Sequence, residues 1–426
     1  MRIAFTTLGC KINQYETDVM RQDLLSQGNT IVPFDAEADV YIINTCSVTA
    51  KSDYQCRQVI RAAARRGQAA KIVVTGCYAE TRPEELKNIP GVDLVIGNHD
   101  KATIPYHIMK DASASIPETL PTGSVPVPIK TLQDRTRAFL KIQDGCDNRC
   151  SYCIVPLARG GSRSVEFGSV VGEFERLVQR GCPEVVLTGI HIGAYGSDLR
   201  PVTGLTELLA TLISKRGHTR IRLSSIEPTE ITAELISFLG PSLCRHLHIP
   251  LQSGDDTVLT TMKRNYTSGF YREVLENISQ RVPGVALGAD VMVGFPGEGE
   301  KEFQNTLELV EQSPLTHLHV FSYSPRPGTR AAELKQQVPD QVKKERSEAL
   351  RELGKKKNFD FRKKCMGTEV KVIVEGKRDM NSRLLTGITD NYMRVLVFGA
   401  KKSHIGKETS VKIEKVEKET ILATIL

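Results

Sequence analysis

The sequence predicts an α/β multidomain fold: an N-terminal domain with a parallel sheet, a central partial barrel of six strand–helix units, and a small C-terminal β-barrel of the OB-like kind. Three observations predict it. Short apolar runs alternate with helical segments up to about residue 99, and again from about residue 136 to about residue 339. A stretch rich in Pro, Ser and Thr separates these two regions. The last part of the chain changes to short β runs.

The composition is that of a globular protein with more than one core. The chain has 426 residues, of which 40% are apolar and 25% charged. It contains no apolar run long enough to predict a membrane span, and its first residues lack the layout of a signal peptide. We therefore expect a cytoplasmic protein. Ten cysteines in that reducing compartment predict metal ligands or buried thiols instead of disulfides.

The N-terminal domain is expected at residues 1–106. Its strand and helix runs alternate, at residues 3–8, 13–27, 40–44, 52–66, 72–75 and 94–96. A cysteine follows each of the first three strand runs, namely Cys10, Cys46 and Cys77. Because the carboxyl ends of parallel strands share one edge of a sheet, these thiols should converge. Three thiolates predict an iron–sulfur cluster with one open iron, although buried structural cysteines would also fit.

A linker at residues 107–135 leads to the central domain, expected at residues 136–360. Its predicted strands lie at residues 138–142, 184–187, 220–223, 246–250, 285–293 and 318–323, with helices such as 165–180 and 204–215 between them. Six such units predict an open, partial parallel barrel whose site lies at the carboxyl ends of its strands.

The central domain opens with the most informative motif of the chain, Cys146, Cys150 and Cys153 in a C-x-x-x-C-x-x-C run. Three thiolates at this spacing fit three irons of one [4Fe–4S] cluster, and no fourth cysteine follows before Cys182. The open iron could chelate a small molecule. Zinc is the alternative, but zinc sites usually add a second cysteine or histidine pair. The loop follows the first barrel strand and therefore lies on the catalytic face.

The C-terminal domain is expected at residues 361–426. Its short strand runs lie at residues 370–374, 384–389, 393–398, 409–413 and 421–425. It carries 14 Lys and Arg against 8 Asp and Glu, nearly all of the chain's net charge of +7. A basic helix at residues 343–364 precedes it. This charge predicts a polyanion such as RNA as partner, although a solvated basic surface would look the same.

Several segments resemble the methylthiotransferases of the radical S-adenosylmethionine (SAM) superfamily, over essentially the whole chain. The cysteine loops of that family's N-terminal domain resemble LGCKINQYET, NTCSVT and VVTGCYAE. Its radical SAM loop resembles KIQDGCDNRCSYCIVPLARGGSRS, and its barrel motifs resemble LSSIEP, HIPLQSGDDTVLTTMKRNYT and GADVMVGFPGE. The tail resembles the TRAM domain, an RNA-binding module.

The resemblance implies an enzyme with two [4Fe–4S] clusters and SAM as cofactors. The cluster on Cys146, Cys150 and Cys153 would cleave SAM. The cluster on the three N-terminal cysteines would carry the sulfur to be transferred. One SAM would methylate that sulfur and a second would give the radical. An external electron donor and a sulfur donor are implied as further partners.

The resemblance also implies a SAM pocket. Its expected lining is Tyr152, Gly189, Ser225, Glu227 and Gln252. Glu227 is the expected polar contact, and a satisfied buried carboxylate is the alternative.

The resemblance implies a substrate as well. The type that modifies a ribosomal-protein aspartate has Pro-Lys-Asn after its first cysteine, and the type acting on isopentenyl-adenosine in tRNA usually has Gln-Met-Asn. This chain has Lys11-Ile12-Asn13 and resembles most the type that methylthiolates C2 of N6-threonylcarbamoyladenosine at tRNA position 37, in the anticodon loop. Methylthiolation of either other substrate is the alternative, and a non-catalytic RNA-binding iron–sulfur regulator is the alternative from another class.

Other motifs are less specific. His246 with His248, and His317 with His319, lie two apart on predicted strands and so share a face. They could form a metal site, but packed or hydrogen-bonded histidines are more common. Arg264 could face the sulfur-carrying cluster, RNA or a salt-bridge partner. The remaining cysteines lack paired spacing and are expected to be core or surface thiols.

Overall fold

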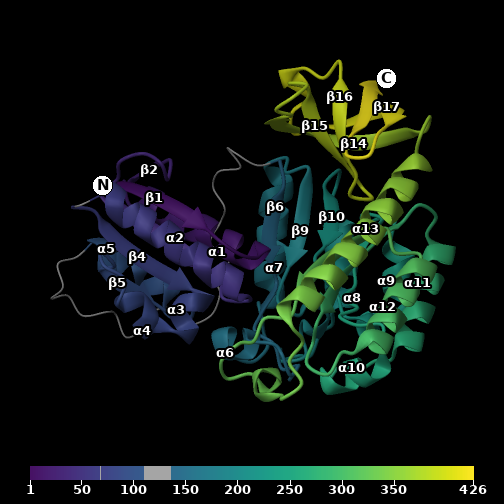
Figure 1. The fold of residues 1–426 in the computed structure, drawn as a ribbon. Coiled ribbons are helices and arrows are strands. Elements are labelled where there is room, and N and C mark those ends of the chain that lie inside the picture. Colours follow the sequence, from purple (N-terminus) through teal and green to yellow (C-terminus); the bar gives the residue numbers. More distant parts are fainter. Residues whose placement is uncertain (68, 110–135) are drawn as a thin grey trace.

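The computed structural model describes residues 1–67, 69–109 and 136–426, and it has the predicted three-part architecture (Figure 1). The predicted linker begins inside a helix, α5 (Ile104–Met109), and its residues 110–135 lie outside the described part. The predicted domain bounds stay predictions. Within the described residues, no helix is long and apolar enough to cross a membrane.

The N-terminal domain is a five-stranded parallel sheet in the order β2-β1-β3-β4-β5. Its strands are β1 (Arg2–Thr7), β2 (Thr30–Val32), β3 (Val40–Thr45), β4 (Lys71–Gly76) and β5 (Leu94–Ile96). Its helices are α1 (Lys11–Ser26), α2 (Ala50–Arg66), α3 (Cys77–Thr81), α4 (Pro83–Lys87) and α5. The central strand β3 is buried throughout, because Tyr41 and Ile43 pack toward α2 while Val40 and Ile42 pack toward α1 and α5.

The central domain is a six-stranded open barrel of two parallel three-stranded sheets, β10-β9-β6 and β11-β12-β13. Single parallel bridges between Ile221 and Leu243 and between Ser225 and His248 join the sheets. The strands are β6 (Ala138–Lys141), β9 (Glu184–Thr188), β10 (Arg220–Leu223), β11 (His246–His248), β12 (Ala286–Val293) and β13 (His317–Ser322).

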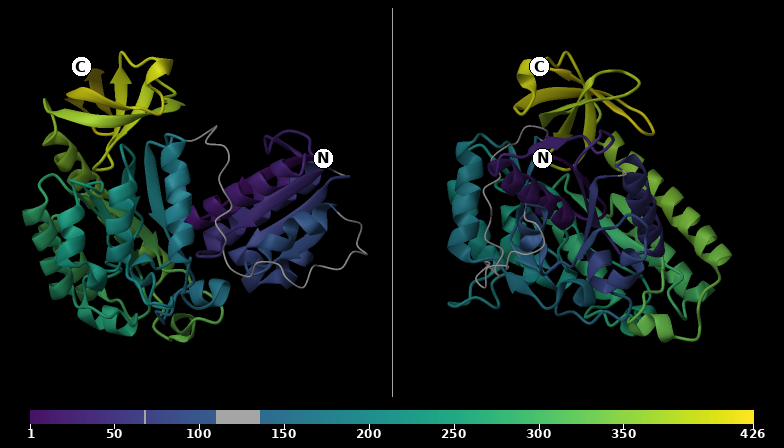
Figure 2. Two further views of the ribbon diagram at one scale, coloured as in Figure 1. Left: turned by 180° about the vertical axis from the view of Figure 1, so that it is seen from behind. Right: turned by 90° about the vertical axis from the view of Figure 1, so that its left-hand side faces the viewer.

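Helices cover the outer face of the barrel (Figures 1 and 2). They are α7 (Phe167–Gln179), α8 (Leu205–Lys215), α9 (Ala233–Phe238), α11 (Ser268–Arg281), α12 (Glu300–Gln312) and α13 (Asp340–Lys363). One apolar core joins these helices to the sheets; Leu247, Leu287 and Val291 belong to it. Alternate residues of the same strands, such as His248 and Asp290, therefore face the inside of the barrel.

Short elements frame the cysteine loop of the barrel. They are the strand pair β7 (Gln143–Asp144) with β8 (Arg163–Ser164), and the helices α6 (Val155–Arg159) and α10 (Asp256–Thr261). They lie beyond the carboxyl ends of the barrel strands. The predicted position of the loop at the carboxyl ends of the barrel strands is thus confirmed.

The C-terminal domain is a closed five-stranded barrel in the order β14-β15-β16-β18-β17. The strands are β14 (Glu369–Arg378), β15 (Leu385–Thr389), β16 (Arg394–Phe398), β17 (Glu408–Val416) and β18 (Ile421–Ile425). Inward side chains such as Val372, Val395 and Ile413 fill it.

Three arginines of the central domain, two in β10 and one just before β11, help to hold this small barrel in place. Arg220 donates to the carbonyl oxygens of Ile388 (3.2 Å) and Lys371 (3.0 Å), and Arg222 to those of Thr389 (3.0 Å) and Asp390 (2.9 Å). Arg245 pairs with the Asp390 carboxylate at 2.7 Å. The two domains therefore form one packed unit.

Candidate active site

The barrel cysteine loop runs from Cys146 to Cys153, and two close backbone approaches shape it. Gly145 has a φ of +70°, and a Cβ there would lie 1.9 Å from the carbonyl oxygen of Gly161. Only glycine fits such an approach. The Cys146 amide then donates to the Gly160 carbonyl at 3.1 Å. The loop thus presents its three partly exposed thiols on one short segment.

Charged side chains from three other loops surround these thiols. The Arg264 guanidinium donates to the Sγ of Cys150 at 3.2 Å and pairs with Glu227. The His191 Nδ1 lies 3.7 Å from the Sγ of Cys146, and its Nε2 contacts Glu230. Of the positions expected for Arg264, the structure shows the salt bridge, here with Glu227. The thiol that Arg264 contacts is Cys150 of the barrel loop and not a cysteine of the N-terminal site.

The protonation of the site follows from burial and these contacts. Burial raises the pKa of the Cys153 thiol to about 12, and the charges of Cys150 and Cys146 add to the rise. Burial opposes the charge on His191, but hydrogen bonds with Cys146 and Glu230 raise its pKa to about 10. The thiolates that bind a metal therefore need nearby positive charge, which Arg264 and His191 supply beside two of them.

A cavity of about 150 Å³ opens beside the cysteine loop. It is lined by Asn148, Cys150, His191, Glu227, Thr229, Glu230, Lys263, Arg264, Asn265 and Tyr266. Of the five predicted SAM-pocket residues, only Glu227 lines it. Sequence reasoning missed His191 and Glu230, which lie in separate segments, and Lys263 and Asn265, which lie in a third, the loop between α10 and α11. The position of His191 just beyond the carboxyl end of β9 was the available signal.

The other predicted pocket residues lie at the strand ends around the cavity. Gly189 follows β9 and Ser225 follows β10, and Tyr152 packs edge-on against Phe295 at 6.5 Å. Gln252 has a φ of 63°, which side-chain-bearing residues rarely adopt, and its buried Oε1 has no partner among the described residues. An orphaned buried carbonyl oxygen beside the site suits a ligand contact. The role of these four residues in binding SAM stays a prediction.

Cys10, Cys46 and Cys77 come together at the carboxyl edge of the N-terminal sheet. A Cβ on Gly9, at φ +104°, would lie 2.7 Å from the Cβ of Cys46. Burial, together with the charges of the neighbouring Cys77 and Cys10 thiolates, raises the pKa of the Cys46 thiol to about 11. Cys46 and Cys77 are buried and Cys10 is exposed. The predicted convergence is confirmed; the cluster on it stays a prediction.

Arg159 joins the two cysteine sites. Its buried guanidinium donates to Asn13 Oδ1 at 2.6 Å and to Glu16 at 2.8 Å, just after Cys10. It also pairs at 3.0 Å with Asp144, just before the barrel cysteine loop. A second link runs from Asn98, which donates to the Ala158 carbonyl at 2.6 Å and contacts the Cys77 Sγ at 3.6 Å.

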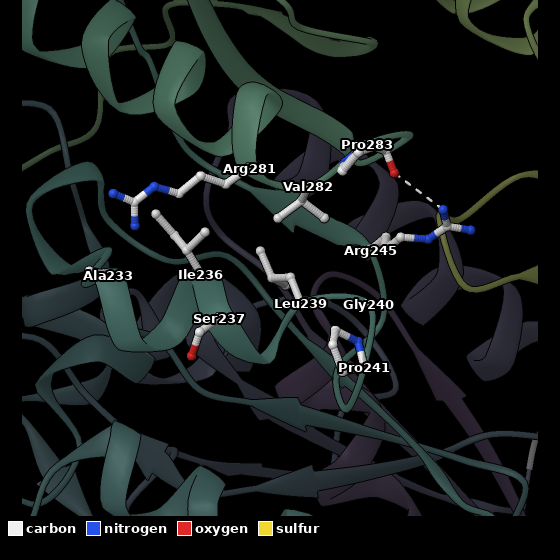
Figure 3. A pocket seen from close by; sticks show the side chains of 10 residues that line it. All are labelled: Ala233, Ile236, Ser237, Leu239, Gly240, Pro241, Arg245, Arg281, Val282 and Pro283. Carbon is white, nitrogen blue, oxygen red and sulfur yellow. Dashed lines mark hydrogen bonds between the residues drawn. The ribbon is translucent and has the colours of Figure 1, made fainter.

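A larger cavity of about 480 Å³ is unrelated to this chemistry (Figure 3). It lies between α9 and the end of α11, near Arg245 and Pro283, which precede the amino ends of β11 and β12. The cysteine loop lies beyond the opposite ends of the barrel strands.

Comparisons with known proteins agree with this three-part arrangement. Family profiles match the chain in sequence: the uncharacterized protein family UPF0004 at residues 2–97, the Radical SAM superfamily at residues 140–310 and the TRAM domain at residues 363–426. The threonylcarbamoyladenosine tRNA methylthiotransferase MtaB of Bacillus subtilis is 42% identical over 97% of this chain and 94% of its own length. The chain belongs to the radical SAM methylthiotransferase family.

Two further comparisons bear on this methylthiotransferase. The MtaB protein of Thermotoga maritima is 36% identical over 99% of this chain and 96% of its own. Among solved structures, the radical SAM methyltransferase TsrM of Kitasatospora setae matches with a TM-score of 0.57 at 16% identity, over 78% of this chain and 77% of its own. That second likeness is one of fold.

Membership of the radical SAM superfamily implies a [4Fe–4S] cluster and SAM in the methylthiotransferase. The residues fit both. Cys146, Cys150 and Cys153 offer three thiols from one loop, which leaves one iron of a cluster open. The adjoining cavity carries acidic, basic and amide side chains suited to the charged groups of SAM.

Proposed function

We propose that this methylthiotransferase replaces the C2 hydrogen of N6-threonylcarbamoyladenosine at tRNA position 37 by a methylthio group, with two [4Fe–4S] clusters and two SAM molecules. The observation that carries the proposal is the presence of two three-cysteine sites linked through Arg159. The Bacillus subtilis and Thermotoga maritima relatives are both named threonylcarbamoyladenosine tRNA methylthiotransferases, which supports this modified adenosine as the substrate.

The protein's own residues would divide the work between the two sites. Cys146, Cys150 and Cys153 would hold one cluster, and the three N-terminal cysteines the other. When bound, these cofactors supply the radical, the sulfur and the methyl group. The SAM pocket is proposed to be lined by Tyr152, Gly189, Ser225, Glu227 and Gln252.

The tRNA would be bound by more than one domain. The basic C-terminal barrel is proposed to bind phosphates, while the anticodon loop enters the central domain. Single-stranded loops are the usual targets of specific RNA recognition, since their bases can be unstacked. An external electron donor and a sulfur donor are further proposed partners. Because its substrate is a tRNA, the enzyme is proposed to act in the cytoplasm.

Nucleoside mass spectrometry of tRNA from cells with and without the gene tests the proposal. Loss of the gene should remove 2-methylthio-N6-threonylcarbamoyladenosine and leave its unmodified precursor. Loss of a methylthiolated isopentenyl-adenosine from the same nucleosides, or of a methylthiolated aspartate from ribosomal-protein peptides analysed in parallel, would instead identify a sibling substrate. If no methylthio group changes anywhere, the protein is a non-catalytic RNA-binding regulator and the proposal is wrong.

A further inference from the structure

Four histidines and an aspartate line the inner face of β11, β12 and β13, and none of them belongs to either three-cysteine site. The histidines are His246, His248, His317 and His319. The rings of His246 and His317 stack with centroids 5.6 Å apart, and those of His248 and His319 lie 4.9 Å apart. Gly288 makes room for this column, because a Cβ there would lie 2.1 Å from the Nε2 of His317.

Asp290 adds a carboxylate oxygen to this column of four histidine rings. Its Oδ1 lies 3.0 Å from the Nε2 of His248 and 3.4 Å from the Nδ1 of His319. All three donor atoms lie within 4.8 Å of one another. The sequence motif showed only the two histidine pairs, since Asp290 lies in a separate and otherwise apolar strand. Parallel pairing places Asp290 directly across from His319.

We propose that His248, Asp290 and His319 bind one divalent transition-metal ion on the inner face of the barrel, separate from the cysteine-bound clusters. The spacing fits such an ion. Ligand bonds of about 2.0–2.2 Å place neighbouring donors of one ion roughly 2.9–3.5 Å apart. The separations of Asp290 Oδ1 from the two histidine nitrogens, 3.0 and 3.4 Å, fall in that range.

The donor chemistry defines the class of ion. Two imidazole nitrogens and one carboxylate oxygen favour Zn²⁺, Fe²⁺, Co²⁺ or Ni²⁺ over Mg²⁺ and Ca²⁺, which prefer oxygen ligands only. Three protein ligands leave further coordination positions for water or a substrate oxygen.

The exposure of the three side chains provides a route to the site. The exposed fraction rises from 9% at His248 to 26% at Asp290 and 67% at His319. An ion can thus enter past His319 while the inner ligands are held by the sheet. The column also contains ring nitrogens that make no hydrogen bond: both buried ring nitrogens of His246 lack partners among the described residues.

Equilibrium dialysis of the cluster-loaded protein against micromolar Co²⁺ tests the proposal. Metal per chain is counted by mass spectrometry, and iron is counted in the same samples. Wild type should bind one more Co²⁺ per chain than Asp290→Asn or His319→Gln, or bind it at least tenfold more tightly. Counting by difference removes any Co²⁺ held by thiols. His218→Gln, the same change at an exposed residue, should match wild type.

A thermal-unfolding measurement keeps the test independent of activity. Co²⁺ should raise the Tm of wild type and of His218→Gln, but not that of the two ligand variants, because only the folded site binds the ion. His319 is exposed, so its variant should fold and keep its iron. Equal Co²⁺ contents and equal Tm shifts in all four proteins would show that the cluster is only a hydrogen-bonded His–Asp–His group.

Discussion

Cys10 is the exposed member of a site whose other two cysteines, Cys46 and Cys77, are buried. Its replacement should therefore disturb the N-terminal core least. We expect Cys10→Ala to stop formation of the methylthio product and to spare SAM cleavage, because the barrel site has its own ligands. Mass spectrometry of 5′-deoxyadenosine and of the modified nucleoside measures both. Cys365→Ala, outside both sites, is the control. Loss of SAM cleavage with an intact barrel cluster would contradict this division of labour.

Arg159 is a positioning residue on the geometry described. Arg159→Gln removes one of two cations shared by Glu16 and Asp144, since Lys141 stays within 3.8 Å of both carboxylates. Loss of one member of this buried charge network should lower the free energy of unfolding by about 1–3 kcal/mol. The coupling of the sites should also loosen, so product formed per 5′-deoxyadenosine should fall by roughly tenfold.

Chemical denaturation and the ratio of the two products test this prediction about Arg159. The control is Arg200→Gln, since Arg200 is exposed and donates to the adjacent Leu199 carbonyl. A lowered stability with an unchanged product ratio would leave Arg159 a purely structural residue.

At the scale of elements, the barrel cysteine loop depends on one close backbone approach. Gly145→Ala places a methyl group against the Gly161 carbonyl in a left-handed conformation. The loop should no longer close, so iron in the reconstituted protein should fall from about eight per chain to about four. SAM cleavage should be lost with it.

Gly172→Ala is the matched control for this loop. Gly172 lies in α7, and nothing lies within 4 Å of an added Cβ. The change should stabilise the helix by about 0.5–1 kcal/mol and leave the iron content unchanged. Equal iron contents in the two glycine variants would refute the role given to Gly145.

Sequence patterns predicted the long elements and missed the short ones for a physical reason. Five of the six barrel strands and all five tail strands have at least four residues and show their apolar period, and the three-residue β11 was predicted within the longer run at residues 246–250. Strand β2 has three residues, and β7 and β8 have two each, so no periodicity can appear in them. The grouping of the six cysteines into two sites could be predicted because their spacing is local or tied to strand ends; their role as cluster ligands stays a prediction.

The rest of the site could not be predicted because it is assembled by tertiary contacts. Glu230 and Lys263 reach the cavity from loops far apart in the chain. Arg159 lies in the segment that resembles the family's radical SAM loop, yet only the packing of the two domains brings it to Asn13 and Glu16. Asp290 did carry a signal, as the charged residue of an apolar strand.

At the scale of the whole molecule, tRNA binding should depend on exposed lysines of the tail. Lys401, Lys402 and Lys407 are exposed and have no side-chain partner among the described residues. Changing all three to Gln should weaken tRNA binding and reduce the slope of log affinity against log salt by about two to three, near one per lost phosphate contact. Both clusters and SAM cleavage should be unaffected.

Affinity measured over a range of salt concentrations tests this prediction about the tail. The charge-matched control changes Lys87, Lys215 and Lys301 to Gln, outside the tail. Deleting residues from about Gly367 onward is a less clean experiment, because it strips partners from the buried Arg222. If the tail and control variants show the same salt slope, the tail is not the RNA anchor.

The contact between the central domain and the tail determines how readily C-terminal domains can be exchanged between relatives. Arg220 and Arg222 donate hydrogen bonds to main-chain carbonyl oxygens of the tail, and every amino acid has such an oxygen. The side-chain demands of this contact are three acidic residues of the tail: Asp390 opposite Arg245, Glu408 opposite Arg220 and Glu375 opposite Arg137. A tail grafted from a relative should dock in the same pose if its chain path is kept and acidic residues occupy these three positions. The surface of the tail proposed to contact RNA is thus free to change in sequence while the surface that docks on the central domain stays the same.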